Sequence, residues 1–272
     1  MQDQEKLIQQ LKDALVAIKK LKADAQLEKE KTHEPIAIVG MAMRFPGNVN
    51  NADEYWNLLL NNIDAIEDIP ASRFDVNAFY TKEPTTGKIT LKQGGFLKDI
   101  DLFDASFFDI TRVEAESIDP QQRLLLEVSY EALENAAVNM DDLVDSNTGV
   151  FIGITNVDYQ KKHFRSGDYE LVNPYSYSGA AVAANSGRIS YAFGLQGPSV
   201  ALDTACSSSL VAAHLAAQAL RNKDCDMAIV GAANIILEPE LSIVFSNLNA
   251  LSSDAHCKPF SPSIGTVTYS IP

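Results

Sequence analysis

Three short apolar segments that alternate with helical segments constrain the fold of this chain more than any other feature. TGVFIGIT (148–155), PSVALDTA (198–205) and CDMAIVGAAN (225–234) combine β-branched and small apolar residues, as buried strands do. A helix of small residues is predicted over 178–195 and a second helix over 206–222. Strands that alternate with helices form a mainly parallel sheet with helices on both faces. The sequence therefore predicts an α/β fold.

The segments before these strands predict two helices, one more strand and an irregular lobe. DPQQRLLLEVSYEALENAAV is typical of a helix that Asp119 caps and Pro120 opens, and NADEYWNLLLNNIDAI of a shorter capped helix. PIAIVGMAMRFPG predicts a strand over Ile36–Val39 that runs into Gly40. Since Gly40 lacks the companion glycines of a dinucleotide-binding turn, that function is excluded. Residues 70–118 are rich in Phe, Asp, Pro and Gly and predict irregular structure.

The first 31 residues form a separate unit. They contain no Gly, Pro or aromatic residue, and apolar residues recur at alternating spacings of four and three: Leu7, Leu11, Ala14, Ile18, Leu21 and Ala25. This heptad seam predicts a coiled-coil helix that joins two copies or docks a partner. The alternative is an amphipathic helix that lies on its own domain. Pro35 disfavours continuation of the helix.

Composition and charge exclude several classes of partner. The chain of 272 residues has a formal net charge of −14, which argues against nucleic-acid backbones and anionic lipid as partners. No run approaches the ~20 apolar residues of a membrane span, and the polar N-terminus is unlike a signal peptide. The three cysteines are an odd number without metal-ligand spacing. We therefore expect free thiols, no bound metal and a cytoplasmic location.

Cys206 is the candidate nucleophile. It lies in DTACSSSLVAAHLA, where a predicted strand turns into a predicted helix. Such a turn holds a nucleophile at the edge of a sheet with its side chain exposed. The unpaired N–H groups of the first helical turn stabilise a thiolate and help to hold an oxyanion. The alternative for Cys206 is a small buried residue at the start of a helix.

No histidine has a strong case as the base for Cys206. His214 lies eight residues further along the same helix, about 12 Å away along its axis, too far for a hydrogen bond. His33 lies in a linker, and His163 and His256 lie in polar loops, so only the fold could bring one of them close. A different thiol enzyme, such as a hydrolase or protease, therefore lacks an identifiable triad. Cys225 and Cys257 lack the context of Cys206 and are interpreted as structural.

Five stretches, in order along the chain, resemble one known family. They are EPIAIVGMAMRFPG, GGFLKDIDLFDASFF, DPQQRLLLEVSYEALENA, GRISYAFGLQGPSVALDTACSSSLVAAHLAAQAL and LNALSSDAHCKPF. Over about residues 33–260 the chain resembles β-ketoacyl synthases, in particular the ketosynthase domains of modular type I polyketide synthases. The resemblance implies a thiolase-like layered fold, of which this chain holds mostly the N-terminal half, and a homodimer.

The resemblance also implies a reaction and its partners. Cys206 would accept an acyl chain from the phosphopantetheine arm of an acyl carrier protein, with no tightly bound cofactor. A malonyl-type extender would then lose CO2 and attack the thioester in a Claisen condensation. Covalent catalysis of this kind divides one difficult step into two easier ones. Residues 5–30 resemble the coiled coil through which such proteins dock an upstream synthase polypeptide.

The chain departs from the family in its second half. The two histidine motifs that serve decarboxylation, and the glycine-rich segment that supplies a second oxyanion donor, do not occur. We expect three parts: a docking helix and linker (1–31), a ketosynthase N-terminal domain (32–260) and a truncated or frameshifted tail (261–272). We expect acylation of Cys206 without condensation by the chain alone. The alternative function is a non-catalytic docking or assembly module of a polyketide or fatty-acid synthase.

Overall fold

A three-stranded parallel sheet forms the centre of the protein. The computed structural model describes residues 2–31, 34–165 and 167–258. Strand β3 (Thr148–Ile154) lies between β4 (Ser199–Leu202) and β5 (Met227–Ala233), with Val150 opposite Ser199 and Ile229. All seven residues of β3 are buried. The parallel sheet predicted from the alternating pattern is therefore confirmed.

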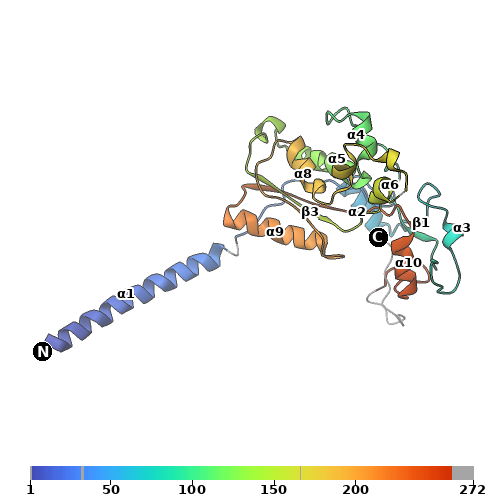
Figure 1. Ribbon diagram of the computed structural model, residues 1–272. Coiled ribbons are helices and arrows are strands. Elements are labelled where there is room, and N and C mark those ends of the chain that lie inside the picture. The colour runs from blue at the N-terminus through green and yellow to red at the C-terminus, as the bar shows by residue number, and fades with distance from the viewer. Residues whose placement is uncertain (1, 32–33, 166, 259–272) are drawn as a thin grey trace.

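Helices cover both faces of this sheet. Helix α9 (Ser208–Asn222) packs on β3 and β5 from one side, while α5 (Pro120–Asn135) and α8 (Ala184–Ala192) lie on the other side (Figure 1). Val150 and Ile152 of β3 join the core with α5 and α8, and Phe151 joins the core with α9. The alternation of side chains along a strand explains this division. The result is a layered α/β structure.

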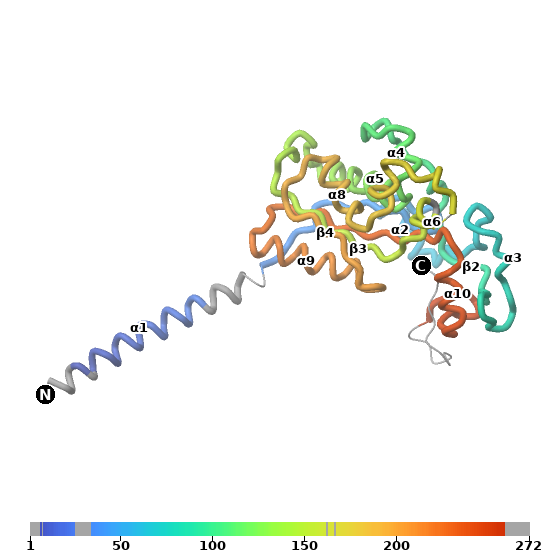
Figure 2. The backbone as a smooth tube through the Cα atoms, in the orientation of Figure 1, coloured from blue at the N-terminus to red at the C-terminus, as the bar shows by residue number. Residues whose placement is uncertain are grey.

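Smaller elements form a lobe beside the sheet. Strands β1 (Ile66–Asp68) and β2 (Gln93–Gly95) pair antiparallel, and Ile89, Phe96 and Ile236 belong to a second core there. Figure 2 shows β2 grouped with α3 (Val76–Phe79) and α10 (Glu240–Asn247) at the side of the molecule away from the N-terminal helix α1 (Gln2–Lys31). The remaining elements are α2 (Ala52–Leu60), α4 (Arg112–Ser117), η1 (Met140–Asp142), α6 (Gln160–Phe164), η2 (Tyr169–Leu171) and α7 (Ser176–Ala180).

Capping residues fix the starts of the two helices that the sequence predicted in the first half. The Asp119 carboxylate accepts a hydrogen bond from the N–H of Gln121, and Pro120 is the first helical residue of α5. Asn51 caps α2 in the same way, by accepting from the N–H of Glu54 at 2.9 Å. Both predictions of a capped helix are therefore confirmed.

The predicted strand over Ile36–Val39 is wrong. This segment has no strand partner among the described residues, and Ile38 and Val39 are 82% and 62% exposed. A strand needs a neighbouring strand to bind its N–H and C=O groups, and apolar residues alone do not supply one. The segment is fixed at its end by Gly40, where an added Cβ would lie 2.2 Å from the carbonyl oxygen of Ala132 in α5.

The predicted helix over 178–195 is two helices. Helix α7 ends where Ala181 adopts an extended conformation (ψ 134°), and α8 begins at Ala184. The side-chain amide of Gln122 donates to the carbonyl oxygens of Gly179, Ser178 and Ala181 at 3.0, 3.2 and 3.5 Å. Carbonyl groups bound in this way are satisfied without a continuous helix, so the chain can turn between the two segments.

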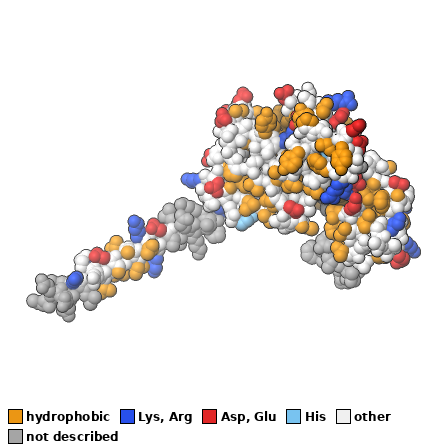
Figure 3. Space-filling model, in the orientation of Figure 1, with side chains coloured by type: hydrophobic (Ala, Val, Ile, Leu, Met, Phe, Trp, Pro, Cys, Tyr) orange, Lys and Arg blue, Asp and Glu red, His pale blue; other side chains and the backbone are white. Residues whose placement is uncertain are grey.

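Helix α1 (Gln2–Lys31) extends away from the rest of the protein (Figures 1 and 2). Every described side chain between Lys6 and Asp24 is exposed, and Figure 3 shows hydrophobic and basic side chains along the helix. The structure therefore does not support the alternative that the helix lies on its own domain. In the part of the chain that the structure describes, no helix has the length and apolar character for crossing a membrane. The predicted tail over 261–272 lies outside the described residues.

Candidate active site

Cys206 lies in the turn that joins β4 to α9. The strand ends at Leu202, the helix begins at Ser208, and the side chain of Cys206 is exposed. Ala205 has a φ of 54°, a left-handed conformation that residues other than glycine rarely adopt. The alternative of a buried Cys206 is therefore wrong. The turn presents the thiol beyond the carboxyl end of a parallel strand, where ligands of open α/β sheets bind.

Side-chain hydrogen bonds hold this turn in shape. The Asp203 carboxylate accepts from the N–H of Ala205 and from the hydroxyl of Thr155, each at 2.8 Å. The Ser208 hydroxyl accepts from the N–H of Thr204 at 2.9 Å and donates to the carbonyl oxygen of Ala205 at 2.7 Å. These bonds fix the backbone on both sides of the cysteine, so they offset the strain at Ala205.

Helix α9 begins directly after Cys206, with the N–H groups of Ser207 and Ser208 bound to the carbonyl oxygens of Thr204 and Ala205. Ser207 occupies the capping position, but its side chain caps no N–H of the helix. Its hydroxyl donates instead to the carbonyl oxygen of Thr204 at 2.8 Å. N–H groups at a helix start carry partial positive charge and suit an anion, such as a thiolate or the oxyanion of acyl transfer.

Strand β3 passes directly beneath the start of α9. A Cβ added to Gly153 would lie 2.7 Å from the carbonyl carbon of Ser208 and 2.8 Å from the nitrogen of Ser209. Contacts this short do not occur for real side chains, so the helix can begin here only over a glycine. Gly153 therefore sets the distance between β3 and the first turn of α9, and so it also sets the position of the neighbouring Cys206.

The other two cysteines differ from Cys206 in their surroundings. Cys225 is 1% exposed and packs in the core with Phe151 and Ala219. Burial raises the pKa of the Cys225 thiol. Its interpretation as structural is therefore confirmed. Cys257 is exposed in a loop that follows α10.

The contacts found for the histidines are with groups other than Cys206. His163 is buried, and its Nδ1 lies 3.1 Å from the hydroxyl oxygen of Ser176. His256 binds the Asp64 carboxylate at 2.9 Å, and this bond raises the pKa of His256. His214 is exposed on α9, and His33 lies outside the described residues. In the described part of the chain, no cluster of His, Cys, Asp and Glu could hold a metal ion.

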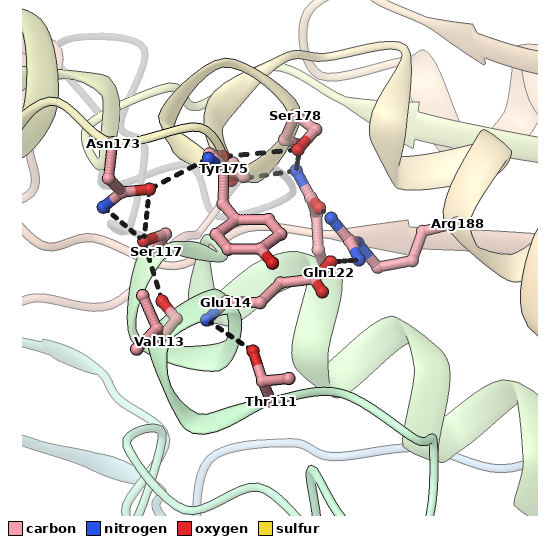
Figure 4. Close-up of polar contacts among 10 residues, drawn as sticks. Thr111, Val113, Glu114, Ser117, Gln122, Asn173, Tyr175, Ser178 and Arg188 are labelled. Carbon is pink, nitrogen blue, oxygen red and sulfur yellow. Dashed lines mark hydrogen bonds and ion pairs between the residues drawn. The ribbon is translucent and has the colours of Figure 1, made fainter.

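A polar cluster on the other side of the sheet was not predicted from the sequence. Arg188 of α8 binds Glu114 of α4 at 2.7 Å and Gln122 of α5 at 3.0 Å (Figure 4). Both charged side chains of this pair are largely buried, at 13% and 22% exposure. Figure 4 also shows Asn173 and Ser117 facing each other, with Asn173 donating at 2.9 Å. In the sequence, the one sign of this cluster is Arg188, a charged residue within the small-residue segment 178–195.

Buried polar groups also tie the start of α5 to the ends of β3 and β5. The Gln121 side chain donates to the carbonyl oxygen of Asn156 at 2.9 Å and accepts from the N–H of Ile235 at 3.2 Å. Asp119 beside it is 5% exposed, and burial raises the pKa of its carboxyl to about 6. This end of the sheet is therefore held by side chains of a helix start.

The fold and the turn together define a class: layered α/β proteins that present a cysteine where a parallel strand turns into a helix. Residues 33–266 match the family model described as the N-terminal domain of β-ketoacyl synthases. The chain belongs to this family. The resemblance stated from the sequence motifs is thereby confirmed.

Curated relatives of the chain are much longer polypeptides. The chain is 46% identical over 229 residues to one of the subunits of the phenolphthiocerol/phthiocerol polyketide synthase of Mycobacterium tuberculosis. The match covers 84% of this chain and 12% of that polypeptide. Another subunit of the same synthase is also 46% identical, over 228 residues and 15% of its length. The chain therefore spans only 12% and 15% of the lengths of these two relatives.

Solved structures of ketosynthases share the fold. The oxazolomycin ketosynthase domain of Streptomyces albus superposes with a TM-score of 0.77 at 36% identity, covering 83% of this chain and 38% of that one. A ketosynthase from module 6 of the bacillaene synthase of Bacillus subtilis gives a TM-score of 0.69 at 40% identity, covering 81% and 35%. The predicted thiolase-like fold, present as its N-terminal part, is confirmed by these similarities.

Proposed function

We propose that the chain is the acyl-accepting part of a polyketide β-ketoacyl synthase and that Cys206 carries the acyl group. The observation that carries this proposal is the exposed thiol in a hydrogen-bonded turn before α9, in a chain of the ketosynthase family. An acyl carrier protein presents the substrate on its phosphopantetheine arm. The relatives are polyketide synthase subunits, which supports this class of partner.

The proposed step is a transfer between two thioesters. The Cys206 thiolate attacks the carbonyl carbon of the acyl-phosphopantetheine, and the carbonyl oxygen becomes an oxyanion. The partial positive charge at the start of α9 would stabilise that oxyanion, and the absence of a side-chain cap at Ser207 supports this role. The intermediate then collapses: the bond to the pantetheine sulfur breaks, and the released pantetheine thiolate takes up a proton. An acyl thioester remains on Cys206.

We expect the chain alone to transfer the acyl group without condensing it. Decarboxylation of an extender and stabilisation of the carbanion need acid and base groups beside the thioester. The contacts of His163 and His256 are with Ser176 and Asp64. The chain also covers only 38% of the matched oxazolomycin ketosynthase domain. Condensation is accordingly assigned to an assembly that contains further groups.

The test is to offer acyl and malonyl carrier proteins to the purified chain and to weigh the intact protein. We expect one acyl adduct on the unaltered chain, and none after Cys206→Ala. Cys257→Ala is the matched control, because Cys257 is also exposed but lies outside the turn. An adduct that survives Cys206→Ala would overturn the nucleophile assignment. Robust β-keto product from the chain alone would overturn the expectation that the chain alone does not catalyse condensation.

The second candidate function is a docking or assembly module without chemistry. The observation that favours it is helix α1, whose described seam residues are exposed and suit association with a second copy or an upstream synthase polypeptide through residues 5–30. The two functions separate in the same experiment. A chain that binds carrier protein but never forms the adduct has only the docking function. We propose a cytoplasmic location, which agrees with three cysteines that are not joined in disulfides.

A further inference from the structure

The side chain of Thr155 links the end of β3 to the turn that holds Cys206. The backbone pairing of β3 with β4 ends at Gly153 and Leu202. Thr155 follows the last residue of β3, and Asp203 follows the last residue of β4. The Thr155 hydroxyl donates to the Asp203 carboxylate at 2.8 Å. A side-chain bond therefore continues the link between the two segments at the point where their backbone pairing stops.

The directions of the hydroxyl bonds around this link follow from their acceptors. Each hydroxyl has a single proton, and an ionised carboxylate only accepts. Thr155 therefore donates to Asp203, and Ser208 donates to the carbonyl oxygen of Ala205 at 2.7 Å. No proton is then left for the 3.3 Å approach between the hydroxyl oxygens of Thr155 and Ser208. The bond to Asp203 is thus the stronger of these two contacts of Thr155 with the turn.

The carboxylate oxygen that binds Thr155 also shapes the backbone before Cys206. The same Oδ1 atom of Asp203 accepts from the N–H of Ala205 at 2.8 Å. The left-handed conformation of Ala205, with a φ of 54°, is costly for alanine and persists only where its surroundings hold it. Because Ala205 directly precedes Cys206, its conformation sets the direction of the cysteine side chain. Thr155 therefore acts on the thiol through one carboxylate oxygen and one backbone N–H.

Neither residue of this link belongs to the hydrophobic core. Thr155 and Asp203 are both exposed, as Cys206 is. Removing the Thr155 hydroxyl therefore opens no cavity in the packed interior, and the overall stability should change little. A change in acylation after such a substitution would report on the geometry of the turn rather than on unfolding.

We propose that Thr155 and Asp203 are a pair of positioning residues, which hold the turn so that the Cys206 thiol is aligned with the incoming acyl thioester. Their bond would keep Ala205 in its left-handed conformation while charge moves from the sulfur to the carbonyl oxygen. A site that is held in advance needs no rearrangement at that moment. This inference rests on the proposed acyl transfer to Cys206, and it adds the residues that orient the nucleophile.

The experiment measures single-turnover acylation of the full chain by an acyl carrier protein, followed by intact-protein mass. Thr155→Val keeps the shape of the side chain and removes the hydroxyl, so the maximal rate should fall roughly tenfold. The carrier concentration for half of that rate should change by less than about twofold, because a positioning residue acts on the chemical step. Thr155→Ser restores the donor, so its rate should lie within about twofold of the unaltered chain.

Changes at Asp203 test whether the two residues act together. Asp203→Asn keeps an oxygen that accepts both bonds and should retain most of the rate, whereas Asp203→Ala should lower it roughly tenfold or more. Adding Thr155→Val to Asp203→Ala should lower the rate by less than about twofold further, because residues that act through one bond are not additive. A further tenfold loss would show that the two residues act independently, and it would overturn the proposed pair.

Thr148→Val is the matched control, because it removes the same hydroxyl at the other end of the same strand. Thr148 is the first residue of β3, and its hydroxyl lies 2.8 Å from that of Ser146. The control variant should be acylated at the rate of the unaltered chain. A loss as large as that of Thr155→Val would show a general effect on β3 and would overturn the proposal.

Amide hydrogen exchange tests the link without any acylation. The N–H of Ala205 should exchange roughly tenfold faster in Thr155→Val and at its usual rate in Thr155→Ser. If the unaltered chain takes up no acyl group, the proposed function fails, and the exchange rates still show whether the link holds the turn. Unchanged exchange or unchanged acylation in Thr155→Val would overturn the inference, and so would a failure of Thr155→Ser to restore them.

Discussion

Gly153 of β3 packs against the backbone at the start of α9, next to the turn that holds Cys206, and this contact leaves no room for a methyl group. A Cβ there would lie 2.7 Å from the backbone of Ser208, so Gly153→Ala must lift the first turn of α9. We expect acylation of Cys206 to slow by roughly tenfold or more, with overpacking costing about 1–3 kcal/mol of stability. Acylation rates and thermal unfolding of the variant check this.

Gly187→Ala is the control for this change. Gly187 lies within α8, and no atom lies within 4 Å of the position of its added Cβ. Alanine there should leave acylation unchanged and stabilise the helix by about 0.5–1 kcal/mol. Equal acylation by the Gly153 and Gly187 variants would show that β3 does not set the position of the turn.

Asp119, which caps the start of α5, has a buried carboxyl, and this burial makes the stability of the folded protein depend on pH. The pKa of Asp119 is raised to about 6 in the folded protein, from 3.8. The folded protein therefore holds this proton more tightly than the unfolded chain. As pH rises from about 4 to about 6, the free energy of unfolding should fall by on the order of 3 kcal/mol through this group. Below about pH 4 the carboxyl is protonated in both states, so its stabilising effect is fully present and no longer changes with pH.

Asp119→Asn tests this dependence, because asparagine also caps helices but does not titrate. We expect urea unfolding of the variant to show a flatter decline in stability between pH 4 and pH 7 than the unaltered protein. Asp75, an exposed cap of α3, provides the comparison: Asp75→Asn should leave the slope as it is. An unchanged slope for Asp119→Asn would contradict a pKa of Asp119 that burial raises in the folded protein.

Within the described residues, the sheet has two open edges, because its outer strands β4 and β5 each pair only with β3. Within the described residues β5 is an edge strand, none of its residues is buried, and Val230 is 43% exposed. The apolar segment Ile36–Val39 is exposed as well. Unpaired edge strands with apolar side chains invite pairing with other chains. We expect Val230→Lys to reduce association of the chain at high protein concentration, as measured by light scattering.

Val113→Lys is the matched comparison for the edge. Val113 is 59% exposed on the short helix α4, where no strand edge is open. The same lysine there should change association little. If Val230→Lys associated as strongly as the unaltered chain, the open edge of β5 would not be the contact that drives association.

The sequence could predict what depends on local pattern and capping. The parallel sheet follows from three apolar segments, and the start of α5 from Asp119 and Pro120. The strand over Ile36–Val39 could not be judged in this way, because pairing depends on a neighbour distant in sequence. The break between α7 and α8 depends likewise on Gln122, which lies 56 to 59 residues earlier in the chain.

At the candidate active site, too, local features could be predicted from the sequence and contacts between distant segments could not. The exposed Cys206 before α9 was predicted, since a strand that meets a helix fixes such a turn. The roles of Asp203 and Thr155 were not, because their bond joins two strands that are adjacent only in the sheet. Nothing in the letters DTAC indicates that Ala205 takes a left-handed conformation, since alanine has no preference for it.

The length of α1 has a consequence for how tightly a docked protein must bind. Its 30 residues span about 45 Å, so a protein held on the helix stays within that radius of the chain's body. One molecule confined to such a volume is present at an effective concentration on the order of millimolar. If a carrier protein is held there, as proposed, it would meet Cys206 many times in each docking event, even when its own affinity is weak.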